Sequence, residues 1–248
     1  MIQHSFSLED QIDFAKLSGD YNPVHVDSVI ARRTRFGHPV VHGLHALLWA
    51  LEILVASKSD FLKLVSLRAY FNHSIGLGEI VQLIIKSEGE TCAEIQLLSR
   101  NKQVARIVVS YVPWENEEYL NFSDSNPGSR DCLDRNPEQL ANAAGKLDLC
   151  LSRNETTQRF PSLMRVFPSS QLAELMAITR LIGMECPGLN SIFSDLNLNF
   201  SNPCDGVPYL NYKVLSCDQR IGLLTQNVEA PGMTGILRAF IRPSPQNQ

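Results

Sequence analysis

The sequence predicts an α+β protein made of two repeats, in each of which an antiparallel sheet wraps around one central helix. A long apolar helix followed by four strand-like runs occurs in the first half of the chain, and the same order returns in the second half. Leu67 and Phe71 recur as Leu196 and Phe200, which is typical of a duplicated unit. Because a helix that is apolar on most sides must be covered, a sheet curled around it is the expected architecture.

The elements of the first repeat follow from local patterns. After a short strand at 2–6, Ser7 predicts the start of a helix that ends at 18–20. Pro23 is expected to exclude regular helix around it and to hold Asn22 in an extended conformation. A short helix is predicted at 26–35, a long apolar helix at 43–57, and strands at 65–72, 79–87, 91–98 and 103–112.

The second repeat is separated from the first by a polar segment. Residues 115–136 are acidic and contain Pro and Gly, which is typical of a linker. The chain is therefore divided into a first repeat at 1–114, a linker at 115–136 and a second repeat at 137–248. The second repeat is predicted to contain a capped apolar helix at 169–184 and strands at 193–200, 208–215, 221–228 and 234–242.

Composition narrows the class of protein. With 44% hydrophobic and 19% charged residues, the chain can form an ordinary globular core. Its net charge of −4 does not favour nucleic-acid binding, which usually needs a basic patch. No apolar run reaches the roughly 20 residues that a membrane-spanning helix needs. The cysteines form no C-x-x-C pair and no signal-like start is present, so reduced thiols and a cytoplasmic location are expected.

The segment LSGDYNPVHVD at 17–27 carries the strongest chemical signal. It places Asp20 and His25 five positions apart around a rigid proline turn, and VVHGLHALL at 40–48 follows. A carboxylate and an imidazole near a glycine that opens an apolar helix are suited to general acid–base catalysis. Taken alone, an aspartate after Ser-Gly is more often a turn former, and a single histidine more often structural. The joint pattern with His42-Gly43 favours the catalytic interpretation of the pair.

Two longer runs resemble a known family. FAKLSGDYNPVHVD at 14–27 and FGHPVVHGLHALLWALE at 36–52 are similar to the MaoC-like hydratase/dehydratase family, which includes (R)-specific enoyl-CoA hydratases with a hot-dog fold. Arg68-Ala69-Tyr70-Phe71 and Gly78-Glu79 extend the resemblance over about 2–113. The fold that it implies is a double hot-dog, which agrees with the two-repeat architecture that the order of elements predicts.

The resemblance implies that Asp20 and His25 hold the catalytic water, and that a backbone N–H near Gly43 polarises a thioester carbonyl. Adding water to an α,β-unsaturated thioester places negative charge on the carbonyl oxygen, which the N-terminus of a buried helix stabilises. With both groups on one water, syn addition is expected. The roles of base and acid are assigned to the pair, because closely coupled groups titrate together.

Other residues of the motif receive supporting roles. Asn22 is expected to bond the loop or the histidine, and Gly19 to allow the tight turn out of the preceding helix. His42 is interpreted as a helix-start residue with a structural hydrogen bond. No cofactor is expected. No metal is expected either, because the histidines form no H-x-x-x-H helix pair with a carboxylate.

The second half lacks the acid–base pair. Pro168-Ser169-Ser170-Gln171-Leu172 stands where the first half has Val41-His42-Gly43-Leu44, so the glycine at the helix start is missing too. The second repeat is therefore expected to replace the partner subunit of a hot-dog dimer and to shape the acyl channel, with one active site per chain. Relatives with two repeats often carry the active motif in the C-terminal half, and this departure leaves the acyl chain length undetermined.

The sequence thus predicts reversible hydration or dehydration of 3-hydroxyacyl and trans-2-enoyl thioesters, with (R) stereochemistry implied by the resemblance. The carrier of the substrate is coenzyme A or an acyl carrier protein. Arg32, Arg33 and Arg35 either contact that carrier or belong to a solvated helix face.

Two alternatives are kept beside this function. One is a dehydratase, cyclase or isomerase that acts in a polyketide or lipid pathway, and the other is a non-catalytic thioester-binding protein. Thioesterase activity ranks lower. Nucleic acid is not an expected partner, and no membrane span is expected. A homodimer of double hot-dog chains is kept as an alternative to a single chain.

Overall fold

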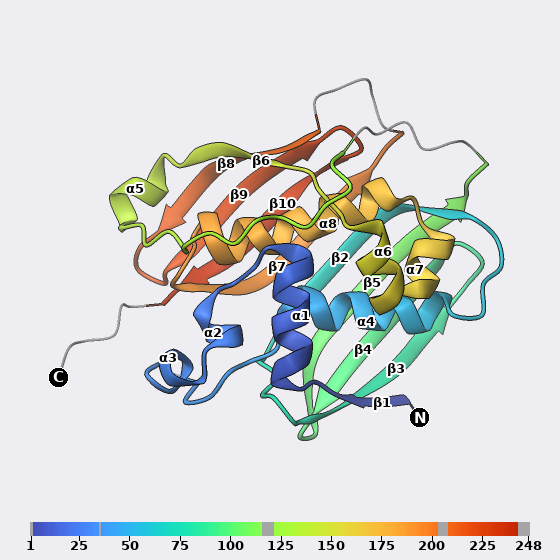
Figure 1. Cartoon of the computed structure of the whole chain (residues 1–248), viewed down its shortest axis with the longest axis horizontal. Helices are drawn as coiled ribbons and strands as arrows, with labels where there is room; N and C mark the ends of the chain where they lie inside the picture. The colour runs from blue at the N-terminus through green and yellow to red at the C-terminus, as the bar shows by residue number, and fades with distance from the viewer. Residues whose placement is uncertain (1, 35, 116–121, 203–207, 243–248) are drawn as a thin grey trace.

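The computed structural model describes residues 2–34, 36–115, 122–202 and 208–242. Within these ranges, ten strands form one antiparallel sheet in the order β1-β3-β4-β5-β2-β7-β10-β9-β8-β6 (Figure 1). The first five strands of this order come from the first half of the chain, and the last five from the second half. β2 and β7 join the two sets, with Arg68 opposite Asn197.

Each half places a helix before a set of strands. The first half contains β1 (Ile2–Ser5), α1 (Leu8–Ser18), α2 (Pro23–Val26), α3 (Ser28–Arg32), α4 (Gly43–Val55), β2 (Leu62–Phe71), β3 (Ile80–Glu88), β4 (Cys92–Ser99) and β5 (Lys102–Pro113). The second half contains α5 (Pro137–Ala141), β6 (Ala144–Asp148), α6 (Arg153–Arg159), α7 (Pro161–Val166), α8 (Ser169–Arg180), the π-helix η1 (Leu181–Glu185), β7 (Ser191–Phe200), β8 (Tyr209–Asp218), β9 (Leu223–Ala230) and β10 (Met233–Ile241). The predicted strands are confirmed, with small differences at their ends.

The two long helices form the centre of the core. α4 and α8 lie on the same face of the sheet, each over strands of its own half (Figure 1). Leu44, Leu47 and Leu51 of α4 are fully buried, and every residue of α8 is buried. The predicted α+β class, with antiparallel strands covering apolar helices, is confirmed. α1 packs against α8, and this contact brings the motif of the first half to the second half.

The single helix predicted at 26–35 is wrong in its extent. Two short helices occupy this region, and α2 begins at Pro23 with Asn22 as its N-cap. Proline fits the first helical position because it lacks only an N–H that would have no partner there, so it starts the helix that it was expected to exclude. Asp27 then ends α2, and its side chain accepts hydrogen bonds from the backbone N–H groups of Val29 and Ile30 at the start of α3.

Two further expectations are refined by the structure. The helix predicted at 169–184 is α-helical to Arg180 and continues as the π-helix η1. Residues 122–136 of the predicted linker are bonded to the second half, since the Leu133 N–H donates to the Met184 carbonyl oxygen at 2.9 Å. The rest of that linker, 116–121, lies outside the described residues.

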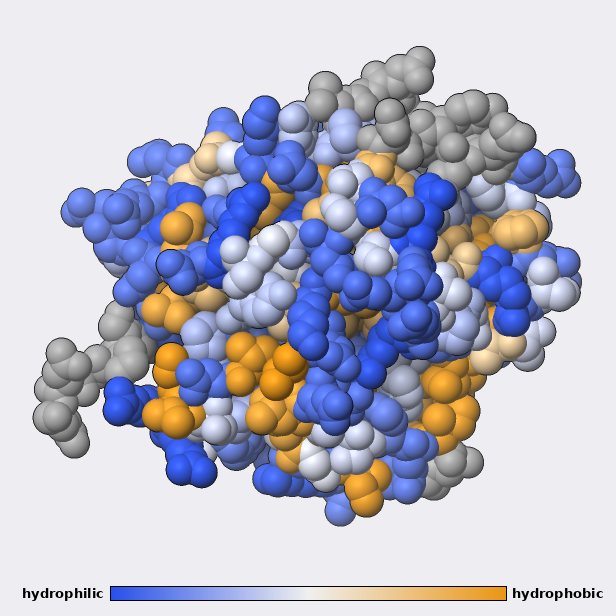
Figure 2. Space-filling model, viewed as in Figure 1, coloured by the Kyte–Doolittle hydropathy of each residue, from blue (hydrophilic) through white to orange (hydrophobic). Residues whose placement is uncertain are grey.

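The surface, the cysteines and the helix lengths also bear on what the composition predicts. The face shown in Figure 2 is mostly hydrophilic, with apolar groups separated by polar ones. The five cysteines in the described ranges are free thiols. Among the described helices, none combines the length and the apolar character needed to cross a membrane.

Glu52 of α4 ties the first half to the second. Its two carboxylate oxygens accept hydrogen bonds from the backbone N–H groups of Ser162 and Leu163, each at 2.8 Å, in the first turn of α7. We expect Glu52→Ala to lower the free energy of unfolding by about 2 kcal/mol, because two bonds to a charged acceptor are lost. Urea unfolding measures this change. Glu52→Gln keeps one acceptor oxygen, so its free energy of unfolding should lie between those of the wild type and Glu52→Ala. An unchanged urea midpoint for Glu52→Ala would contradict the role of Glu52 in joining the two halves.

Candidate active site

The turn that carries Asp20 is built by the end of α1. Ser7 and Asp10 cap the start of this helix with reciprocal hydrogen bonds. At its end, Gly19 adopts a φ of 78° and donates its N–H to the Ala15 carbonyl oxygen. This left-handed conformation is strained for residues with a Cβ atom and free of strain for glycine. Gly19 thus makes the tight turn that directs the chain from α1 into the motif.

Asp20 is buried, with 2% of its surface exposed. Each carboxylate oxygen accepts one hydrogen bond: Oδ1 from the Asn22 N–H at 3.2 Å, and Oδ2 from the Thr179 hydroxyl at 2.7 Å. Burial raises the pKa of Asp20, while His25 and the two hydrogen bonds act in the opposite direction. A carboxyl group that is costly to ionise but lies near a basic ring is suited to taking and returning a proton.

His25 lies on α2 with one ring nitrogen fixed. Its Nδ1 is 2.8 Å from the Val40 carbonyl oxygen, which can only accept, so Nδ1 carries the proton. Nε2 therefore keeps a lone pair. Burial lowers the pKa of His25 to about 3, so the ring is neutral at pH 7. A neutral ring with a fixed tautomer can accept a proton from water at Nε2.

His42 lies behind the pair and links it to α1. Its ring stacks on that of His25, with 3.8 Å between the ring centroids. Nε2 is 3.0 Å from the Asp20 carbonyl oxygen, and Nδ1 is 2.9 Å from Gln11 Oε1. His42 is also the N-cap residue of α4. These contacts support the interpretation of His42 as a helix-start residue that holds the motif in place.

The side chains of Asp20, His25 and His42 offer ligand atoms within 4.8 Å of one another, a spacing that a metal ion could use. Both ring nitrogens of His42 face oxygen atoms, however, and Asp20 Oδ2 accepts a hydrogen bond from Thr179. A histidine ligand must direct a lone pair at the metal, and His42 has no nitrogen placed to do so. The geometry therefore favours proton transfer, and the expectation of no metal stays a prediction.

Gly43 is the first residue of α4 and lines the same cavity as Asp20 and His25. The first N–H groups of a helix have no intrahelical partner and carry partial positive charge. A Cβ atom at Gly43 would lie 3.2 Å from Phe71 Cδ1, so a side chain here would crowd that ring. A carbonyl group placed in the cavity at this helix end therefore has backbone donors available and an aromatic ring beside it.

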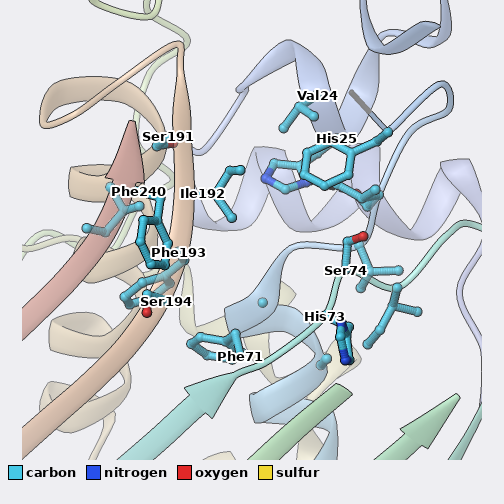
Figure 3. Close-up of a pocket in the computed structure, with 18 of the residues that line it drawn as sticks. Val24, His25, Phe71, His73, Ser74, Ser191, Ile192, Phe193, Ser194 and Phe240 are labelled. Carbon is cyan, nitrogen blue, oxygen red and sulfur yellow. Dashed lines mark hydrogen bonds between the residues drawn. The ribbon is translucent and has the colours of Figure 1, made fainter. Parts of the chain in front are cut away.

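The cavity in front of these residues has a volume of about 690 Å³ and is lined by both halves of the chain. Figure 3 shows His25 on one side of it, and Ile192 and Phe193 of β7 on the other. The rings of Phe71 and Phe193 lie 5.0 Å apart and form an apolar wall. β2 and β7 pair from Ser66 opposite Asn199 to Tyr70 opposite Asp195, and the cavity lies beyond this last pair, where the two strands part. It can therefore hold an apolar chain beside the acid–base pair.

The second half was expected to shape the acyl channel, but the residues with which it reaches this site were not identified from the sequence. Thr179 bonds Asp20 directly, and Gly183 leaves the space that the carboxylate needs, because a Cβ atom there would lie 2.0 Å from Asp20 Oδ1. Arg242, just after β10, lines the same cavity. Gly183 inside a predicted helix was the one local signal, since glycine weakens a helix interior unless space is required. Nothing in the sequence singles out Thr179.

Asn22 bonds its own loop and the second half. Its Oδ1 accepts from the Val24 N–H, and its Nδ2 donates to the carbonyl oxygens of Gly183 and Gly188. The Asn22 side chain was expected to bond either the loop or His25. It bonds the loop, and among the described contacts its amide forms no hydrogen bond to His25. Asn22 therefore clamps the motif against the segment that follows α8.

The predicted basic cluster lies on the surface near the cavity. Arg32 and Arg33 are exposed, on and just after α3. The described lining of the cavity includes Phe36 but neither of these arginines. Arg35 lies outside the described residues. Carrier contact and a solvated helix face therefore both stay as predictions for this cluster.

The fold and the site together define a class. The chain is an α+β protein in which a buried carboxylate and a neutral imidazole meet at a cavity that a helix N-terminus also lines. Residues 3–106 match the MaoC like domain family. The first half of the chain is therefore similar to the MaoC-like domain.

Two curated proteins are similar over short segments. A 3-hydroxybutyryl-CoA dehydratase of Methylorubrum extorquens is 38% identical over 45 residues, which cover 18% of this chain and 29% of that protein. A peroxisomal hydratase-dehydrogenase-epimerase of Saccharomyces cerevisiae is 44% identical over 39 residues, which cover 16% of this chain and 4% of that protein. The chain thus matches less than a third of the length of either relative.

A solved structure extends the likeness to both halves. A MaoC-like dehydratase superposes with a TM-score of 0.57 at 11% sequence identity, and the superposition covers 98% of this chain and 96% of that chain. At this level of identity the likeness establishes a shared fold. It therefore includes the second half, which the family match does not reach.

Proposed function

We propose that this protein catalyses the reversible hydration or dehydration of 3-hydroxyacyl and trans-2-enoyl thioesters carried by coenzyme A or an acyl carrier protein, with (R) stereochemistry. One observation carries the proposal. Asp20 and the neutral ring of His25 converge on a cavity that is also lined by Gly43 at the N-terminus of α4. The dehydratase named among the similar proteins acts on a compound of this class, which supports the choice of substrate.

The reaction needs a proton transfer on each side of the double bond. In the hydration direction, the pair removes a proton from water while the oxygen of that water bonds to the β-carbon. The electrons of the double bond move toward the carbonyl, and the α-carbon then receives a proton from the same pair, so that one water is added in total. Because both groups hold a single water, the two additions occur on one face.

The helix N-terminus stabilises the intermediate charge. As the β-carbon bond forms, negative charge develops on the thioester oxygen, and in this proposal the N–H groups at the start of α4 donate to it. Gly43 suits this position because a Cβ atom would crowd Phe71. Asp20 is buried beside the cavity, and electrostatic interactions are stronger at such a position than in water.

The proposed organisation is a double hot-dog, with repeats at 1–114 and 137–248 joined by 115–136. Its support is the arrangement of α4 and α8 on one sheet, in which each half supplies five strands. In this arrangement the second repeat stands in for a partner subunit. It contributes Thr179 and Phe193 to the cavity of the first repeat, and the acid–base pair is present once.

The wild-type protein tests the proposed function with two measurements on acyl thioesters. We expect crotonyl-CoA to lose its enoyl absorbance as 3-hydroxybutyryl-CoA forms, with chiral analysis showing the (R) product. Release of free thiol from the same substrate should be far slower. Thiol release without hydration would indicate a thioesterase. Tight equilibrium binding with neither reaction would indicate a thioester-binding protein and would overturn the proposal.

A further inference from the structure

We propose that Thr179, a residue of the second half, is a positioning residue that holds the Asp20 carboxylate in the orientation needed for the reaction in the first half. This inference rests on the proposed function. The Thr179 hydroxyl donates to Asp20 Oδ2 at 2.7 Å, across 159 positions of sequence. Both residues are buried. A hydroxyl that donates to a carboxylate away from water forms one of the stronger kinds of protein hydrogen bond.

The hydrogen bond fixes the carboxylate at its second oxygen. Oδ1 already accepts from the Asn22 N–H at 3.2 Å, so each oxygen has one donor and the plane of the group is set. A carboxylate oxygen has more than one lone pair, and each therefore keeps capacity for a water in the cavity. Without Thr179, one donor would remain and the side chain could rotate away from His25.

The backbone around Thr179 is shaped to receive Asp20. α8 ends at Arg180 and passes into the π-helix η1, a wider turn of a kind often found at functional sites. Gly183 in this turn has no side chain, and a Cβ atom would lie 2.0 Å from Asp20 Oδ1. The Gly183 carbonyl oxygen also accepts from Asn22 Nδ2 at 2.9 Å. The second half therefore contacts Asp20 through the Thr179 hydroxyl and through Gly183, and it contacts Asn22 through the Gly183 carbonyl oxygen.

The same hydrogen bond has a defined effect on proton affinity. A donor to the charged form stabilises the carboxylate, so losing the hydroxyl should raise the pKa of Asp20 further. In the profile of activity against pH, the limb that reports the ionisation of Asp20 then moves to higher pH, whichever of Asp20 and His25 acts as the base. Replacing Thr179 leaves the other titratable and charged residues around the site in place. These residues are His25 from α2, His42 before α4, Cys132 before α5, Arg180 at the end of α8 and Arg242 after β10.

Three variants separate positioning from packing. Thr179→Val keeps the shape and removes the hydroxyl, Thr179→Ser keeps the hydroxyl and removes a methyl group, and Thr156→Val removes a buried hydroxyl elsewhere. Thr156 is a matched control because its hydroxyl donates to the Ser152 carbonyl oxygen, within α6 and its cap. Circular dichroism and thermal unfolding establish that each variant is folded before its kinetics are compared.

We expect Thr179→Val to lower kcat for crotonyl-CoA hydration by about 10- to 100-fold, because a misplaced catalytic group reacts slowly, while KM changes by less than about 3-fold. Thr179→Ser should restore most of kcat, and Thr156→Val should leave it near the wild-type value. The pH profile of Thr179→Val should shift upward on the limb that reports Asp20. Titration of the Asp20 carboxyl by ¹³C NMR should show the same upward shift.

Several results would overturn the inference. One is a Thr179→Val variant with wild-type kcat and an unshifted carboxyl titration. Another is a Thr179→Ser variant as slow as Thr179→Val, since the methyl group and not the hydroxyl would then matter. If Thr179→Val does not fold, the serine variant and its carboxyl titration decide the question. Absence of hydration in the wild type would instead overturn the proposed function, while an altered carboxyl titration would still show that Thr179 acts on Asp20.

Discussion

Asp20→Asn is expected to lower kcat/KM for crotonyl-CoA hydration by about 10²- to 10⁴-fold, the usual contribution of a positioned acid or base. Asparagine has the same shape and can still accept the Thr179 hydrogen bond, but it can neither take nor return a proton. Because Asp20 is buried and its pKa is raised, removing the charge should leave the free energy of unfolding equal or higher. A stable protein without activity would therefore separate catalysis from folding.

The control for this variant is Asp13→Asn on α1, the helix that precedes Asp20. Asp13 is exposed and pairs with Lys16 at 3.0 Å, away from the cavity. It should keep wild-type kinetics. His25→Asn should lose as much activity as Asp20→Asn, and the double variant should be little slower than either, because groups that act as a unit are not additive. An Asp20→Asn variant within about 3-fold of wild type would contradict the role of the pair in general acid–base catalysis.

Glu174→Gln is expected to change how stability depends on pH. Glu174 is buried in α8, where its Oε1 accepts from the Gly232 N–H at 2.9 Å and its Oε2 has no partner within the described residues. Burial raises its pKa from 4.5 to about 7. Between these values the folded protein keeps a proton that the unfolded chain has lost. The free energy of unfolding therefore falls as pH rises through this window and levels off above about pH 7.

Glutamine does not titrate, so Glu174→Gln should not show the fall in the free energy of unfolding that Glu174 causes as pH rises. The stability of Glu174→Gln relative to wild type should increase from pH 5 to pH 8 by up to about 3 kcal/mol, from 1.36 kcal/mol per unit of pKa shift. Urea unfolding at several pH values measures the difference, and the contributions of the buried histidines cancel because both proteins contain them. Glu138→Gln, at an exposed residue of α5, is the control. Parallel stability curves for Glu174→Gln and wild type would contradict the prediction.

The elements could be predicted wherever local patterns dominate. The apolar stripe of α4 and the alternation of the strands depend on spacing of a few residues, which the sequence states directly. The prediction was wrong at 26–35, because proline can start a helix as well as prevent one, and because Asn22 and Asp27 each cap a new helix. The π-helix after Arg180 was also not predicted; Gly183 within it lies against Asp20, a residue distant in the sequence.

The candidate site, like the fold, could be predicted from the sequence only in part. By itself, the sequence determined that Asp20 and His25 would be near each other, because five positions and a proline turn join them, and that Gly43 would begin a buried helix. Only the tertiary structure decided that Thr179 would bond Asp20, that Gly183 would make room for it and that Phe193 would wall the cavity. These contacts join residues more than 100 positions apart. They result from the packing of α1 against α8 and of β2 beside β7, which no local pattern of residues specifies.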